Sequence, residues 1–100
     1  MTGREIVLAI VKAGFPATRP DDLIGLHARV SVPYCGKVYD VRIVRFRTPG
    51  GVLELEAEGL PCVYSRLKYN TGELSWSLIL TPGCPEVAID EIAFYVPTTN

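Results

Sequence analysis

The chain has 100 residues, of which 48% are hydrophobic, and a formal net charge of −1. This length suits one domain with a single hydrophobic core, and the hydrophobic content excludes a chain that is disordered throughout. The near-zero charge excludes a general attraction to nucleic acid or anionic membranes, so a site of that kind would have to be a local patch. We therefore expect one domain over residues 1–100.

The N-terminal residues have the pattern of a helix. Thr2 and Glu5 have the spacing of a capping box, and Gly14 is typical of a helix end, so we expect a helix over residues 3–13. Its apolar residues cover an arc of roughly 200°, whereas a helix that rests on one sheet needs roughly 100°. A second surface should cover the excess. We expect self-association into a homo-oligomer through the apolar side chains Ile6, Val7, Ile10 and Val11.

Apolar and polar residues alternate with a period of two from residue 26 to residue 96. Before this region, Asp21 and Asp22 resemble a helix start and Gly25 a helix stop, which predicts one short helical turn. The alternation predicts six strands over residues 26–32, 37–47, 52–58, 62–69, 73–80 and 87–96, followed by a tail over 97–100. Sequential strands usually pair, so a meander is the simplest arrangement. We expect an α+β domain: the N-terminal helix packed on a six-stranded, mostly antiparallel, strongly curved sheet or small barrel.

The alternation changes phase within residues 37–47. Ile43 and Val44 are adjacent and both apolar, and one extra residue at this point would restore the pattern, which predicts a β-bulge. A four-residue loop over 48–51 would then pair this strand with residues 52–58. In that register the outward side chains would meet as Arg45–Glu54, Arg42–Glu56 and Asp40–Glu58.

The outward side chains of the second, third and fourth strands are basic, acidic and basic in turn. Cross-strand ion pairs account for this pattern, at about a few tenths of a kcal/mol each. The alternative is a nucleic-acid-binding surface, in which cations contact phosphates and a tyrosine stacks on a base. The intervening glutamates oppose it, because they would repel phosphates. The residues of this alternative are Arg42, Arg45, Tyr64, Arg66 and Lys68.

The three cysteines lie in or beside turns that a meander places at one end of the sheet. Their spacing lacks the short chelating pairs typical of zinc sites. An odd number of cysteines favours reduced thiols in the cytoplasm over a secreted disulfide framework. We expect three free thiols and no metal or other cofactor. A trailing hypothesis, a small metal-dependent enzyme, would use Cys35, Cys62 and Cys84 with the facing carboxylates Asp40 and Glu58.

The sequence has no strong catalytic signature, neither a nucleophile elbow nor a Gly-rich phosphate loop before a helix. Its longest N-terminal apolar run, Ile6–Val11, is far shorter than the roughly 20 residues that span a membrane. We expect no membrane segment and no signal peptide. The function we favour is a non-enzymatic interaction or self-assembly module with an unknown protein partner, and the nucleic-acid-binding module is the alternative.

Overall fold

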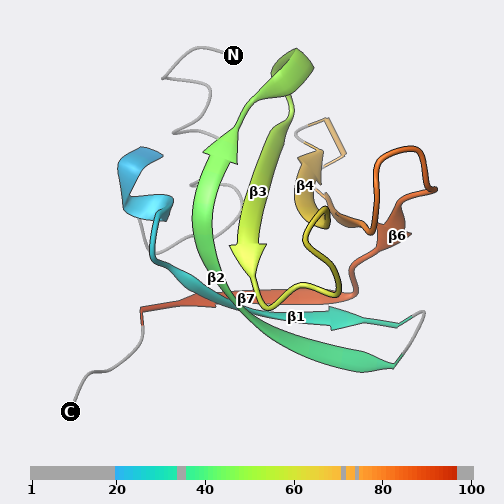
Figure 1. The fold of residues 1–100 in the computed structure, drawn as a ribbon, viewed down its shortest axis with the longest axis horizontal. Coiled ribbons are helices and arrows are strands. Elements are labelled where there is room, and N and C mark those ends of the chain that lie inside the picture. The colour runs from blue at the N-terminus through green and yellow to red at the C-terminus, as the bar shows by residue number, and fades with distance from the viewer. Residues whose placement is uncertain (1–19, 34–35, 71, 74, 97–100) are drawn as a thin grey trace.

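The computed structural model describes residues 20–33, 36–70, 72–73 and 75–96, which form a strongly curled antiparallel sheet (Figure 1). Two 3-10 helices, η1 (Pro20–Leu23) and η2 (Pro49–Gly51), accompany the strands. The seven strands are β1 (His27–Val32), β2 (Lys37–Arg47), β3 (Leu53–Glu58), β4 (Arg66–Asn70), β5 (Ser75–Ile79), β6 (Val87–Ala88) and β7 (Glu91–Tyr95).

The α+β class predicted from the sequence is wrong, because the described residues form an all-β half-barrel of seven strands. No helix among the described residues is longer than the four residues of η1, which forms the helical turn expected before Gly25. The physical reason is that the sheet curls until the apolar faces of its own strands meet, and so forms a core without a described helix. The helix predicted over residues 3–13 and the tail over 97–100 lie outside the described residues.

The last two strands, β6 and β7, form the two opposite edges of the sheet. The strand order is β6–β5–β4–β3–β2–β1–β7, so β1 to β5 form the predicted meander. The segment expected to be one strand over 87–96 is divided, because β6 pairs with β5 whereas β7 pairs with β1. The Ile89 N–H donates to the Trp76 carbonyl of β5 at 3.2 Å, and the Asp90 N–H donates to the Ser31 carbonyl of β1 at 3.0 Å. These two residues therefore join the two edges of the sheet.

The register of β2 against β3 confirms the predicted bulge and corrects the predicted pairing. The register shifts between Ile43 and Arg45, where the bulge was expected. The pairs are Arg47–Glu54, Arg45–Glu56 and Arg42–Glu58, two residues away from the predicted register. The difference arises because η2 lengthens the connection, so the first pair of the hairpin is Arg47–Glu54 rather than Arg47–Val52.

The core lies inside the curled sheet. Alternate residues of β1, such as Ala28, Val30 and Val32, are buried there, as the period of two predicts. Leu23 of η1 and the adjacent Leu26 are also buried and close part of the interior. The remaining buried apolar side chains come from four other strands: Val41, Ile43, Leu53, Leu55, Leu67, Tyr69, Trp76 and Leu78.

Candidate functional site

Ion pairs between neighbouring strands cover the outer face of β2, β3 and β4. Each glutamate of β3 contacts an arginine of β2, and Glu56 also contacts Arg66 of β4, so that Glu56 joins three strands. Their positions follow from the register, which places each arginine opposite its glutamate. The N–O distances are 3.1 Å for Arg47–Glu54, 3.3 Å for Arg45–Glu56, 3.0 Å for Arg42–Glu58 and 3.2 Å for Arg66–Glu56.

The cations of the predicted nucleic-acid surface are all engaged in these pairs or in a similar one. Arg42, Arg45 and Arg66 contact glutamates of β3, and Lys68 contacts Glu86. The fifth residue, Tyr64, lies in the turn before β4 and is 61% exposed. A phosphate bound to this face would have to compete with carboxylates for each cation. The geometry therefore favours the cross-strand pairing and gives no support to the nucleic-acid alternative.

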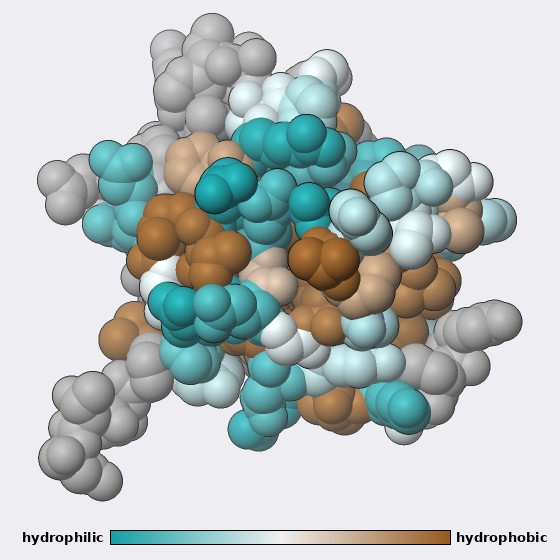
Figure 2. Space-filling model, viewed as in Figure 1, coloured by the Kyte–Doolittle hydropathy of each residue, from teal (hydrophilic) through white to brown (hydrophobic). Residues whose placement is uncertain are grey.

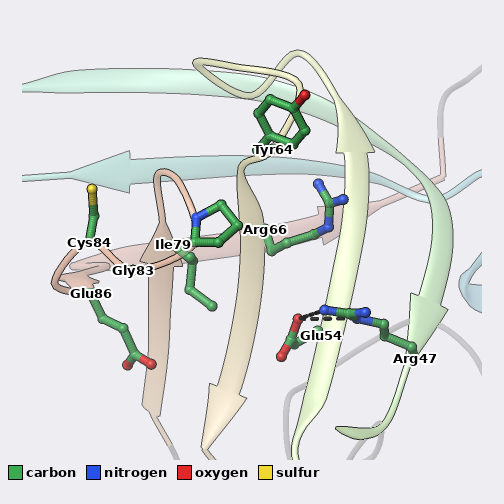
Figure 3. A pocket seen from close by; sticks show the side chains of 9 residues that line it. Arg47, Glu54, Tyr64, Arg66, Ile79, Gly83, Cys84 and Glu86 are labelled. Carbon is green, nitrogen blue, oxygen red and sulfur yellow. Dashed lines mark hydrogen bonds and ion pairs between the residues drawn. The ribbon is translucent and has the colours of Figure 1, made fainter.

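A polar cleft of about 320 Å³ lies between β3, β4 and the loop over residues 80–86 (Figure 3). Arg47, Glu54, Tyr64, Arg66 and Glu86 are among its lining residues. The guanidinium of Arg66 is fixed, because it donates to the carbonyls of residues 63 and 65 at 3.0 and 2.8 Å and pairs with a glutamate. In this cleft, opposite charges neutralise one another, so it offers no unpaired ion to a ligand.

An apolar cleft of about 650 Å³ lies on the other side of the same loop, where Pro33 after β1 and both residues of β6 line the same space. This volume is within the range of ordinary ligand sites. Figure 2 shows hydrophilic side chains over β2 and β3 and hydrophobic surface where Figure 1 places β6. We define the apolar cleft by its lining residues, Pro33, Leu80, Cys84, Pro85, Glu86, Val87 and Ala88.

A small hydrogen-bonded cluster holds the turn before β4 against the apolar cleft. The carbonyl of Leu80, which lines the cleft, accepts hydrogen bonds from the Cys62 thiol and the Ser65 hydroxyl, both at 2.9 Å. The Ser65 hydroxyl also lies 3.2 Å from the Cys62 sulfur and can turn its proton to the thiolate when Cys62 ionises. This hydrogen bond, together with that from the Tyr64 backbone N–H, holds the pKa of Cys62 below its usual value. The turn before β4 and the loop after β5 are therefore neighbours at one end of the sheet, as the meander predicted.

The candidate metal ligands of the trailing hypothesis that the structure describes do not gather into a site. Cys62 and Cys84 are both free thiols, and Cys35 lies outside the described residues. Asp40 faces Arg29 of β1, at 3.2 Å, rather than Glu58, and Glu58 pairs with Arg42. Within residues 20–33, 36–70, 72–73 and 75–96, no three Cys, His, Asp or Glu side chains are grouped as metal ligands would be. The predicted pairing of Asp40 with Glu58 came from a wrong register. Two like charges facing each other are unfavourable, which itself argues against that register.

Sequence reasoning missed the apolar cleft. It also began the fourth strand at residue 62, whereas β4 begins at Arg66 and Val63 is 80% exposed beside Tyr64. The cleft depends on the division of the last strand, which the continuous alternation over 87–96 concealed. One signal was present: Pro85 and Pro33 flank the region, and proline in a strand marks an edge or an interruption. The predicted self-association residues Ile6, Val7, Ile10 and Val11 lie outside the described residues.

Comparisons with known proteins add no relative. A scan against models of protein families, a search of curated proteins and a search of solved structures each found no match. In the part of the chain that the structure describes, no helix has the length and hydrophobicity needed to cross a membrane. The candidate site therefore depends on the geometry of the two clefts and on the chemistry of the residues that line them.

Proposed function

We propose that the protein is a non-enzymatic interaction module that binds a partner protein through its apolar cleft. The observation that carries this proposal is the cleft itself, a concave surface of about 650 Å³ lined by Leu80, Pro85 and Val87 beside an outer face of paired charges. Interaction sites are distinguished by apolar centres with polar rims. The adjoining polar cleft supplies such a rim, with Tyr64 exposed at its margin.

The chemistry of the lining residues supports binding rather than catalysis. The two clefts share Cys84 and Glu86, and Glu86 is tied to Lys68. The Cys84 thiol contacts the Thr81 hydroxyl at 2.9 Å, and neither cleft places a basic side chain against that thiol. Nucleophilic catalysis needs such an activating base. A concave apolar surface without one suits the side chains of a partner.

A selection from a display library of short random peptides tests this proposal. The binders would be synthesised and their affinities measured by fluorescence polarisation for the full chain and for Ala88→Tyr, in which a ring enters the cleft. The matched control is Ala93→Tyr, since Ala93 is also exposed but lies on β7 away from the cleft. We expect Ala88→Tyr to weaken binding about tenfold or more, a loss of about 1.4 kcal/mol, with little effect of the control.

Two results would contradict the proposal: no peptide is selected, or the selected peptides bind Ala88→Tyr as tightly as the unchanged chain. A thermal melt of both variants shows whether each retains its fold. Equal weakening by Ala88→Tyr and Ala93→Tyr would also count against the cleft, because the effect would then be general to the last strands.

We further propose, from the sequence, that this module is cytoplasmic and self-associates through Ile6, Val7, Ile10 and Val11. The support is the wide apolar arc predicted for residues 3–13. Sedimentation velocity of the full chain and of an Ile6→Lys, Ile10→Lys variant measures this directly. A monomer at every concentration would exclude self-association without affecting the proposal for the apolar cleft.

A further inference from the structure

We propose that the partner segment binds in the apolar cleft in extended conformation, as a strand added to β6, and that it carries basic residues beside its apolar ones. This inference rests on the proposed function, since it names the form and chemistry of the ligand for the same cleft. Its support comes from the backbone of the last strands, from Pro33 and from the charges at the two ends of β6.

The backbone of β6 has one free edge. The N–H of Ile89 is directed to β5, whereas the N–H of the next residue, Asp90, is directed to β1. Backbone groups of successive strand residues point to opposite edges, so Ala88 directs its N–H and carbonyl to the same side as Asp90. Among the described residues, β6 pairs with β5 alone. The polar groups of Ala88 on the other edge therefore face the apolar cleft.

The chain's own β1 does not close this edge. The last pair of β7 with β1 is Glu91–Ser31, and Pro33 follows at the end of β1. Proline has no N–H to donate, and the Pro33 carbonyl accepts a hydrogen bond from Gly36 at 3.2 Å within its own turn. Pro33 therefore forms a wall of the cleft, while the ladder between β1 and the last strand ends before it.

An extended peptide satisfies both features of the cleft at once. Its backbone would hydrogen-bond to the free edge of β6, and alternate side chains would enter the space between Pro33 and Leu80. A helical partner would leave the edge of β6 without hydrogen bonds, because all its backbone groups are already bonded internally. The backbone geometry thus selects an extended segment over a helix.

Carboxylates lie at both ends of β6. Glu86 precedes the strand, and Asp90 and Glu91 follow it. One oxygen of Glu86 contacts Lys68, whereas neither Asp90 nor Glu91 forms an ion pair with any residue that the structure describes. Two cations lie nearby: Lys37 is across β1, opposite Val32, and Arg29 lines a small pocket together with Glu91 but forms its ion pair with Asp40. This charge distribution complements a segment with lysine or arginine beside its apolar residues.

The decisive experiment uses the peptides from the display selection, each synthesised in modified forms. In one form, every second backbone amide is N-methylated. In a second form, the other amides are methylated instead. Methylation removes an N–H donor and leaves the side chain, so an added strand should tolerate one set and not the other. We expect one form to bind about tenfold or more weaker and the other to bind nearly as well as the parent.

A third form, in which glutamine replaces each lysine and arginine, tests the charges. We expect it to bind severalfold more weakly at low salt and to approach the parent at high salt, where exposed charges are screened. Hydrogen exchange of the Ala88 amide should slow when the parent peptide binds. Asp90→Asn and Glu91→Gln together should reproduce the effect of removing the peptide's cations.

The outcomes separate the two proposals. If both methylated forms bind like the parent while Ala88→Tyr still weakens binding, the cleft is a binding site but the added strand is wrong. If glutamine-substituted peptides bind as well as the parent at low salt, the charge complementarity is wrong. If Ala88→Tyr has no effect on any peptide, the proposed function fails as well. Peptide-dependent pairing of two copies of this chain, detected by sedimentation, would overturn the assignment of β6 to a separate partner.

Discussion

The two ends of the last strand segment, residues 87–96, differ in how the space beside them is filled. Where β7 lies across from β5, the tilted rings of Trp76 and Phe94 meet with centroids 5.4 Å apart, and Tyr69 extends this ring cluster at 5.0 Å from Trp76. Where β6 lies across from the end of β1, Pro33 interrupts the backbone pairing and an apolar cleft remains. Side chains close one flank, whereas the other stays open.

This difference shows how a small sheet can keep a core while one flank stays open for the proposed binding. Tilted aromatic contacts at one flank stabilise the curled sheet, in which β7 and β5 are not neighbours in the hydrogen-bonded strand order. The open flank can then leave apolar surface and an unpaired strand edge in contact with solvent. We expect substitutions at the closed flank to lower stability and substitutions at the open flank to affect mainly binding.

The largest expected effect is at the closed flank. Trp76 is buried and contacts both Tyr69 and Phe94, so Trp76→Ala removes two ring contacts and leaves a cavity. We expect a loss of about 3–5 kcal/mol in the free energy of unfolding. Urea denaturation followed by circular dichroism measures it, with Trp76→Phe as the control that keeps a ring. A loss below about 1 kcal/mol would show that the ring contacts do not close this flank.

At the open flank, the hydrogen-bonded cluster around Ser65 should hold the shape of the cleft. The buried Ser65 hydroxyl accepts from the Cys62 N–H at 3.2 Å and donates to the Leu80 carbonyl, so Ser65→Ala leaves two backbone groups with poorer partners. We expect a loss of about 1–3 kcal/mol in stability. The exposed-face control is Ser75→Ala, whose hydroxyl makes one long contact of 3.4 Å with Glu73.

The same variant changes the chemistry of Cys62. The Ser65 hydroxyl is the main cause of the lowered pKa of Cys62, so Ser65→Ala should raise that pKa and reduce the thiolate fraction at neutral pH. Because the thiolate is favoured in the folded state, Cys62 contributes stability above its unfolded pKa, and this contribution is lost as pH falls through the folded pKa. The rate of iodoacetamide labelling against pH, mapped by peptide mass, should shift to higher pH. An unchanged profile would contradict this role of Ser65.

The strands were predictable because their physical signal is local. Alternation of apolar and polar residues identifies a strand with one buried face, and a phase change between Ile43 and Val44 was enough to locate the bulge. The order of β1 to β5 followed from short connections. The division of the last strand was not predictable in this way, because the alternation continues through Ile89 and Asp90 while the pairing partner changes.

The register between β2 and β3 was open to a better prediction. Registers two residues apart bury the same face, so hydrophobic patterning does not distinguish them. The charges do. The observed register pairs every glutamate of β3 with an arginine, whereas the predicted one set Asp40 opposite Glu58. The apolar cleft, by contrast, depends on where two distant segments diverge, which no local pattern of this sequence specifies.

A smaller effect of opposite sign is expected from Tyr69, in the closed flank. Its hydroxyl is buried and has no hydrogen-bond partner among the residues that the structure describes, and burial raises the pKa of this phenol. Tyr69→Phe removes a polar atom that lost its water on folding, while the ring keeps its contact with Trp76. We expect stability to stay unchanged or rise by up to about 1 kcal/mol. A clear loss in urea denaturation would mean that the hydroxyl has a partner and that the ring contacts alone do not explain this flank.

The smallest effect is expected from the ion pair beside the open cleft. Lys68 of β4 and Glu86 of the loop over 80–86 are both partly exposed, so their attraction is screened by water and salt. We expect Glu86→Gln to lower stability by about 0.2–1 kcal/mol at low salt, with the loss shrinking as salt is added. A double-mutant cycle with Lys68→Met isolates the pair from other effects of each substitution. A coupling energy above about 2 kcal/mol would contradict the comparison of the two flanks. The loop at the open flank would then depend on this charge pair as strongly as the closed flank depends on its rings.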